Sequence, residues 1–212
     1  MFEVTGDDIS NLSDSNLRDL VARLALAEFR SKGYPRSSIT AGGNQDAADG
    51  GIDVRVECPI EIEDADFVPR RLACFQVKKP DMPPSSILLE MRPKGVLRKV
   101  IVDLAEASGA YVIVSSQGSV ADKSLSDRRN AIRSALSDLP SAGQLYTDFY
   151  DRGRVASWVN EYPGLAAWTR KVVGRALVGW GGVADWSGDT FGDYLYDDKA
   201  CLVDESSRNR NH

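Results

Sequence analysis

The sequence predicts an α/β fold in which a small mixed sheet carries helices on both faces. Residues 52–57 and 73–78 alternate apolar and polar side chains with a period of two, which is typical of strands. Residues 110–114 form a continuous apolar run, which is typical of a strand buried on both faces beside a parallel neighbour. Segments with helical apolar spacing stand before, between and after these runs.

The first predicted element is a helix over residues 14–32, with Ser13 as its N-cap and Gly33 and Pro35 ending it. Its apolar stripe consists of Leu17, Leu20, Val21, Leu24 and Ala25. Glu28 continues this stripe four residues after Leu24, and a buried carboxylate is costly unless it has a partner. Glu28 therefore either serves a site or reaches solvent near the helix end.

The remaining elements follow from turn residues and periodicity. Their order is strands over 37–43, 52–58 and 72–79, a helix over 85–107 interrupted at 92–95, a strand over 110–114, a helix over 121–136, an extended segment over 145–150, and helices over 152–161 and 165–173. After residue 174 the sequence shows no sustained period. We therefore expect one main domain over 1–150 and a helical or irregular extension with a tail over 151–212.

Composition limits the class of protein. The chain has 212 residues, of which 42% are hydrophobic and 27% charged, as in an ordinary globular protein. It contains no apolar run of the roughly 20 residues that span a bilayer, and its acidic start does not resemble a signal peptide. The lack of such a run predicts no membrane association. Three cysteines without a CxxC pair predict a reducing cytoplasm and no zinc site.

The single histidine, His212, narrows the possible chemistry. Mechanisms that need an internal histidine base are nearly excluded, so catalysis would depend on carboxylates, lysine and metal. The net charge of −5 argues against a generic nucleic-acid coat, although residues 70–99 are locally basic. A second basic cluster, on the helix over 121–136, either binds phosphate or forms a solvated face: Arg128, Arg129 and Arg133.

The polar faces of two predicted strands carry the candidate chemistry. Asp53 lies on the strand over 52–58, and Gln76 and Lys78 share one face of the strand over 72–79. If these strands pair, a carboxylate, an amide oxygen and an ammonium group converge on the face away from the core. Oxygen ligands suit a hard divalent cation, and a neighbouring lysine suits a water nucleophile or a phosphate. The pattern predicts metal-dependent phosphodiester hydrolysis.

Two motifs carry a resemblance to a known family. Asp49-Gly50-Gly51-Ile52-Asp53 followed by Gln76-Val77-Lys78 resembles the Mrr-type restriction endonuclease branch of the PD-(D/E)xK nuclease superfamily. The resemblance spans about residues 12–133. It implies a restriction-endonuclease-like core of a helix, a three-strand meander, a helix and a strand, lying within residues 1–150.

The resemblance also implies roles for individual residues. Asp53 would be the central ligand of Mg²⁺, for which Mn²⁺ can substitute. Gln76, the backbone carbonyl of Val77 and Glu28 would complete the metal site, with Gln76 standing where most of the superfamily has an acid. Lys78 would position the attacking water or stabilise charge on the phosphate, unless it is a surface lysine on an edge strand.

Other positions remain open between a site role and an ordinary structural one. Asp49 is an accessory ligand or a turn residue. Gly50 and Gly51 permit a turn or a close approach of DNA. The further candidates for DNA contact are Lys79, Ser115, Ser116 and Arg128. The two serines could equally form a simple turn, and alternation points Lys79 to the opposite face from Lys78.

Two further segments are Asp148-Phe149-Tyr150-Asp151-Arg152 and Gly179-Trp180. With them, the whole chain also resembles the N-terminal effector nuclease of bacterial antiviral STAND-type NTPases. This implies an endonuclease for double-stranded DNA that acts in antiphage defence and self-associates through an NTPase domain outside this chain. The sequence itself has no P-loop pattern. Two alternatives stay open: a catalytically idle nucleic-acid-binding or assembly module of the same fold, and an RNase or structure-specific resolvase.

Overall fold

The computed structural model describes residues 3–34, 39–41, 52–60, 66–118, 121–175, 180–182 and 202–204. For residues 40, 41, 180–182 and 202–204 it describes the backbone alone. Among the helices of these ranges, none is long and apolar enough to cross a membrane.

A five-stranded mixed sheet forms the centre of the protein. Its strands lie in the order β1 (Ile39–Ala41), β2 (Val54–Glu57), β3 (Leu72–Lys78), β4 (Ala110–Ser115) and β5 (Tyr146–Tyr150). The first three strands pair antiparallel, whereas β4 and β5 continue the sheet in parallel. A separate antiparallel pair consists of β6 (Trp180–Gly182) and β7 (Leu202–Asp204).

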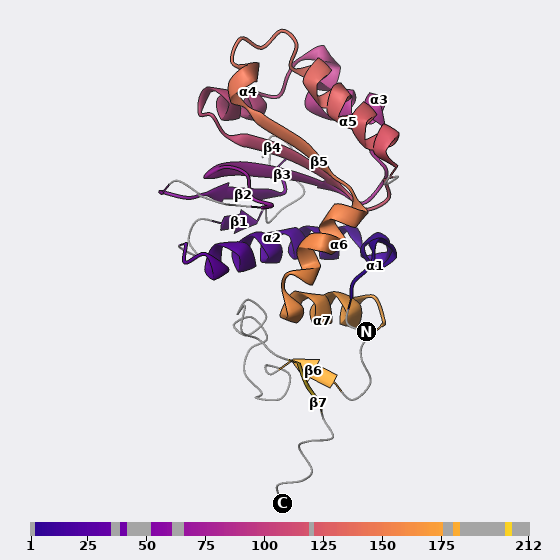
Figure 1. The fold of residues 1–212 in the computed structure, drawn as a ribbon. Helices are drawn as coiled ribbons and strands as arrows, with labels where there is room; N and C mark the ends of the chain where they lie inside the picture. Colours follow the sequence, from indigo (N-terminus) through magenta and orange to yellow (C-terminus); the bar gives the residue numbers. More distant parts are fainter. Residues whose placement is uncertain are drawn as a thin grey trace, which may run out of the picture.

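Helices lie on both sides of the sheet (Figure 1). One side carries α1 (Gly6–Asn11), α2 (Asp14–Ser31), α6 (Arg152–Asn160) and α7 (Pro163–Val172). The other side carries α3 (Pro84–Met91), α4 (Lys99–Glu106) and α5 (Asp122–Ala135), with a 3₁₀ turn over Pro93–Gly95 between α3 and α4. The predicted α/β class, a mixed sheet flanked by helices, is confirmed.

The N-terminal layer shows how local sequence sets helix ends. The Ser13 side chain accepts a hydrogen bond from the Asn16 N–H and begins α2, and Gly33 takes a positive φ of 76° just after it. Helix α1 was not predicted, although Thr5 and Asp8 form a capping box at its start. The motif is short, and the apolar residues around it show no helical repeat long enough to reveal the helix.

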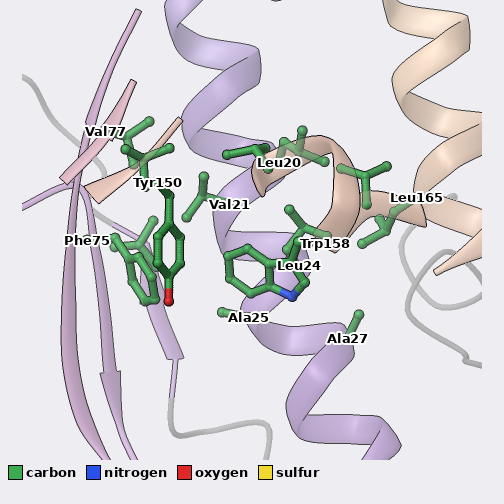
Figure 2. Packing of buried hydrophobic residues seen from close by; sticks show 14 of the residues in the cluster. Leu20, Val21, Leu24, Ala25, Ala27, Phe75, Val77, Tyr150, Trp158 and Leu165 are labelled. Atoms are coloured by element: carbon green, nitrogen blue, oxygen red, sulfur yellow. The ribbon is translucent and has the colours of Figure 1, made fainter. Parts of the chain in front are cut away.

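The larger core lies between the sheet and α2, α6 and α7 (Figure 2). Trp158 of α6 is fully buried there, stacks on Phe67 and contacts Phe75 of β3 and Tyr150 of β5. Truncating a buried tryptophan to alanine typically costs about 3–5 kcal/mol. The helices that follow residue 150 therefore share one core with the sheet.

A second core corrects one expectation. The face of β3 that carries Cys74 and Gln76 was expected to lie away from the core, yet both side chains are buried. Cys74 belongs to an apolar cluster with residues of α3, α4 and α5. Sheets with parallel strands are usually covered by helices on both faces. The polar face of β3 therefore lies beside this second apolar cluster and not in solvent.

Candidate active site

The candidate site begins where the ladder between β2 and β3 ends. Val54 pairs with Phe75, and the Asp53 N–H donates to the Phe75 carbonyl at 3.0 Å. The next N–H of β3 that faces β2, that of Val77, donates to Oδ2 of Asp53 at 2.7 Å. The Asp53 carboxylate thus takes the place of a backbone carbonyl at the ladder's end, and this fixes its position.

Gln76 lies beside this carboxylate. Its Nε2 donates to Oδ2 of Asp53 at 3.2 Å, and the side chain is only 2% exposed. Its Oε1 is buried and has no hydrogen-bond partner among the residues described. An unpaired buried acceptor costs about 1–3 kcal/mol, so this amide oxygen is suited to a ligand that the folded chain does not supply.

Lys78, two residues further along β3, is held by a helix. Its Nζ lies 3.4 Å from Oε2 of Glu90 on α3. Arg98 in turn pairs with Oε1 of Glu90 at 2.9 Å and donates from Nε to the Glu90 carbonyl at 2.6 Å. Lys78 therefore contacts a fixed carboxylate and is not a free surface lysine.

Sequence reasoning missed Glu90 and Arg98. Glu90 directly precedes Met91 and follows Ile87 by three residues, and both of these are buried, whereas Leu89 between them is exposed. A helix that exposes a leucine and turns a glutamate toward the protein indicates a functional glutamate. This indication can be recognised only once the buried face of the helix is known.

On the other side of Asp53 lies Arg18 of α2. Its Nε is 2.9 Å from Oδ1 of Asp53, and its Nη2 pairs with Asp14 one turn earlier on the same helix. Oδ1 of Asp14 accepts a hydrogen bond from the backbone N–H of Lys79 at 3.4 Å. The helix thus contributes one cation and one carboxylate to the surroundings of Asp53.

Burial raises the pKa of Asp53 above its ordinary value, and this effect exceeds the opposing ones. The Val77 N–H and the charges of Arg18 and Lys78 act in the other direction, while Asp14 adds to the rise. A partly buried carboxylate whose charge is costly gains more from a bound cation than an exposed one does.

Glu28 does not join this group, which corrects the prediction of a metal ligand. Its Oε1 accepts hydrogen bonds from the N–H groups of Phe67 and Val68, both at 3.2 Å, and the side chain is 2% exposed. Glu28 follows Arg18 by ten residues, about 15 Å along the helix axis. The alternative that it reaches solvent is also wrong, and burial raises its pKa.

Three of the candidates for DNA contact are buried and bind the protein itself. Ser115 and Ser116 donate to the carbonyls of Pro80 and Lys79 at 3.0 and 3.1 Å. Arg128 is 4% exposed, donates to the Met82 carbonyl and pairs with Asp81 at 2.6 Å. These contacts fasten the segment after β3 to β4 and α5, which corrects both the phosphate-binding and the solvated-face expectations for Arg128.

The remaining predicted residues fall into two groups. Asp49, Gly50 and Gly51 lie outside the described residues. Lys79 is half-buried, and its backbone N–H is the group that bonds Asp14. The carbonyl of Val77 lies on the β2 side of β3, as its N–H does, because the N–H and C=O of one strand residue point to the same neighbouring strand.

A divalent cation fits this arrangement with few protein ligands. Within the described ranges no three or more His, Cys, Asp or Glu side chains gather closely enough to hold a metal. Mg²⁺ is commonly held by one or two carboxylates and completed by waters and substrate phosphates. The Asp53 carboxylate and the unpaired Oε1 of Gln76 meet that requirement if Arg18 gives way at Oδ1.

Comparison of the chain with models of protein families, with curated proteins and with solved structures finds no match. No relative therefore supplies a residue role. The roles proposed below follow from the geometry around Asp53 and from the resemblance of the two motifs.

Proposed function

We propose that this protein is a metal-dependent endonuclease that hydrolyses phosphodiester bonds, with double-stranded DNA as its substrate and a restriction-endonuclease-like core. One observation carries the proposal. Gln76 of β3 contacts the carboxylate of Asp53, the residue before β2, and Lys78 of β3 is close enough for its charge to oppose the rise in the Asp53 pKa. These are three of the residues that the resemblance assigns to the reaction.

The chemistry follows from these residues. Asp53 and the amide oxygen of Gln76 would hold Mg²⁺, or Mn²⁺ in its place, and the bound ion would supply Lewis-acid polarisation of the phosphate. The Val77 N–H keeps the Asp53 carboxylate in position. Lys78 would pair with a phosphate oxygen and so stabilise the negative charge that develops there. Glu90 would set the direction of Lys78 between turnovers.

The wider setting is part of the same proposal. With a net charge of −5, the chain has little electrostatic attraction for DNA. Productive cleavage would then require several copies held together, as expected for an effector domain in antiphage defence joined to an NTPase domain. A monomer that cuts as fast as an enforced oligomer would remove this part of the proposal.

A second candidate function is favoured by the ion pairs. Arg18 neutralises Asp53, and Glu90 neutralises Lys78, so each charged member of the motif already has a partner. Such pairing suits a catalytically idle module that binds nucleic acid or assembles through the same fold. The two functions differ in one measurable property, which is hydrolysis.

The test is a plasmid nicking and linearisation assay with Mg²⁺, Mn²⁺ or EDTA, and with an RNA substrate in parallel. Asp53→Asn and Lys78→Met are compared with Asp103→Asn and Lys99→Met, matched changes at exposed positions of α4. We expect metal-dependent DNA cleavage that only the first pair abolishes. Metal-dependent cleavage of RNA alone would instead identify an RNase, and no hydrolysis by enforced oligomers would leave the idle module.

A further inference from the structure

Arg18 occupies a position between two carboxylates that belong to different elements. Its guanidinium pairs with Asp14 on its own helix and with Oδ1 of Asp53 beside β2. Asp14 is close enough to raise the pKa of Asp53, so the two carboxylates repel each other across the guanidinium. Without a cation between them, this arrangement would be electrostatically unfavourable.

The acceptor atoms of Asp53 are almost fully used. Oδ2 receives the Val77 N–H at 2.7 Å and the Gln76 amide at 3.2 Å. Oδ1 faces Arg18 at 2.9 Å. A metal ion bound to Asp53 must therefore take the Oδ1 side, which is where the guanidinium lies.

Two buried side-chain atoms beside Asp53 lack a hydrogen bond among the described residues. The Nε of Arg18 is buried and, among the described residues, has no partner in hydrogen-bond geometry despite its proximity to Asp53. The Oε1 of the buried Gln76 side chain, whose Nε2 contacts the same carboxylate, is unpaired as well. An unpaired donor and an unpaired acceptor beside one carboxylate point to a different occupant in the functional state.

We propose that Arg18 is an internal counter-ion that a divalent cation displaces, and that Asp14 and Asp53 together receive this cation. The proposal rests on the proposed metal-dependent function and names how that site is regulated. Metal affinity of the resting protein is low because the ion must compete with a tethered guanidinium. Once displaced, Arg18 remains next to the site, where its planar donors suit a phosphate oxygen of the substrate.

The test is Mn²⁺ binding to the full chain, measured by isothermal titration calorimetry. Arg18→Met removes the competing charge and keeps much of the side-chain length, and we expect it to bind Mn²⁺ at least tenfold more tightly than the unaltered protein. Asp14→Asn combined with Arg18→Met should lose most of that gain. Arg23→Met is the matched control, since Arg23 also pairs with an aspartate four residues earlier on α2, and it should leave Mn²⁺ affinity unchanged.

The outcomes separate the two proposals. If Asp53→Asn binds Mn²⁺ as well as the unaltered protein does, the proposed metal site itself is wrong. If Asp53→Asn weakens binding but Arg18→Met does not tighten it, only the role of Arg18 is overturned. Thermal unfolding by circular dichroism verifies the fold, and if Arg18→Met does not fold, Arg18→Gln replaces it. That variant also removes the competing positive charge, and it must bind Mn²⁺ more tightly for the proposal to stand.

Discussion

Helix α2 carries a buried or half-buried charged side chain near each of its ends. Arg18, near the first end, contacts the candidate site, whereas Glu28, near the far end, does not. At the first end, Arg18 pairs with Asp53, beside Gln76 and an unpaired amide oxygen. At the far end, Glu28 accepts two backbone N–H groups of residues 67 and 68. Glu28 is the more deeply buried carboxylate, but its hydrogen bonds lead to a loop.

This difference shows that burial alone does not identify a ligand. A carboxylate that satisfies backbone donors supports the path of the chain, in this case the segment that stacks Phe67 on Trp158. A carboxylate that has a cation beside it and an unpaired oxygen nearby has capacity for a metal. Substitutions at Asp53, Glu28 and Glu90 test this division.

The largest effect is expected at the first end. Asp53→Asn should reduce metal-dependent cleavage by about 10³-fold, because it removes the charge that holds the cation while keeping the side chain's size. Glu28→Gln should leave the rate within about threefold. Initial rates of plasmid cleavage at saturating Mg²⁺ provide the comparison, and an equal loss in both variants would place Glu28 back in the site.

At the far end, the expected effect is on stability. Glu28→Ala leaves the buried N–H groups of Phe67 and Val68 without an acceptor, which should lower the free energy of unfolding by about 3 kcal/mol. Glu28→Gln keeps an acceptor oxygen and should change it by less than about 1 kcal/mol. Urea denaturation measures both values. An alanine variant as stable as the glutamine variant would contradict the assigned role.

A smaller effect is expected at Glu90. Glu90→Gln should lower kcat about tenfold, because Lys78 loses the carboxylate that directs it, with little change in KM. Glu106→Gln, at an exposed position of α4, serves as the control. If Glu90→Gln alters only thermal stability, Glu90 supports the helix and does not position Lys78.

The smallest effect is a pH dependence at the far end. Burial raises the pKa of Glu28 above its ordinary value of 4.5, so the folded state holds this proton more tightly than the unfolded state does. Stability from this group is complete below pH 4.5 and falls as pH rises through the folded-state pKa. Glu28→Gln should therefore gain stability relative to the unaltered protein as pH rises. Chemical denaturation across this range tests the sign, and a constant difference would refute it.

Much of the fold could be predicted because each signal was local. The apolar run over 110–114, the Ser13 cap and the interruption after residue 91 each specify one element by backbone preference or burial. The proximity of Asp53, Gln76 and Lys78 followed from period-two alternation on strands that pair. Alternation could not show, however, that α3, α4 and α5 cover the face of β3 that carries Cys74 and Gln76.

Sequence analysis failed on two points: the position of a residue along a helix axis relative to the sheet, and contacts between residues far apart in the sequence. The apolar stripe of the helix indicates that Glu28 faces the core, but it does not indicate which part of the protein packs against that turn of the helix. Arg18 and Glu90 come from two helices that enclose Asp53 and Lys78 from opposite sides, and only the three-dimensional packing brings them there. Arg128 was read as surface because arginine rarely lies buried without paired contacts, which in this case Asp81 and Met82 provide.

The amide of Val77 gives the site a built-in reporter. Most N–H groups in a sheet are protected from hydrogen exchange by a backbone carbonyl, whereas this one is protected by the Asp53 carboxylate. Its exchange rate and proton chemical shift should therefore follow the charge and occupancy of that carboxylate. The amide resonance of Val77 would then report whether Asp53 has bound a cation, even under conditions in which no substrate is turned over.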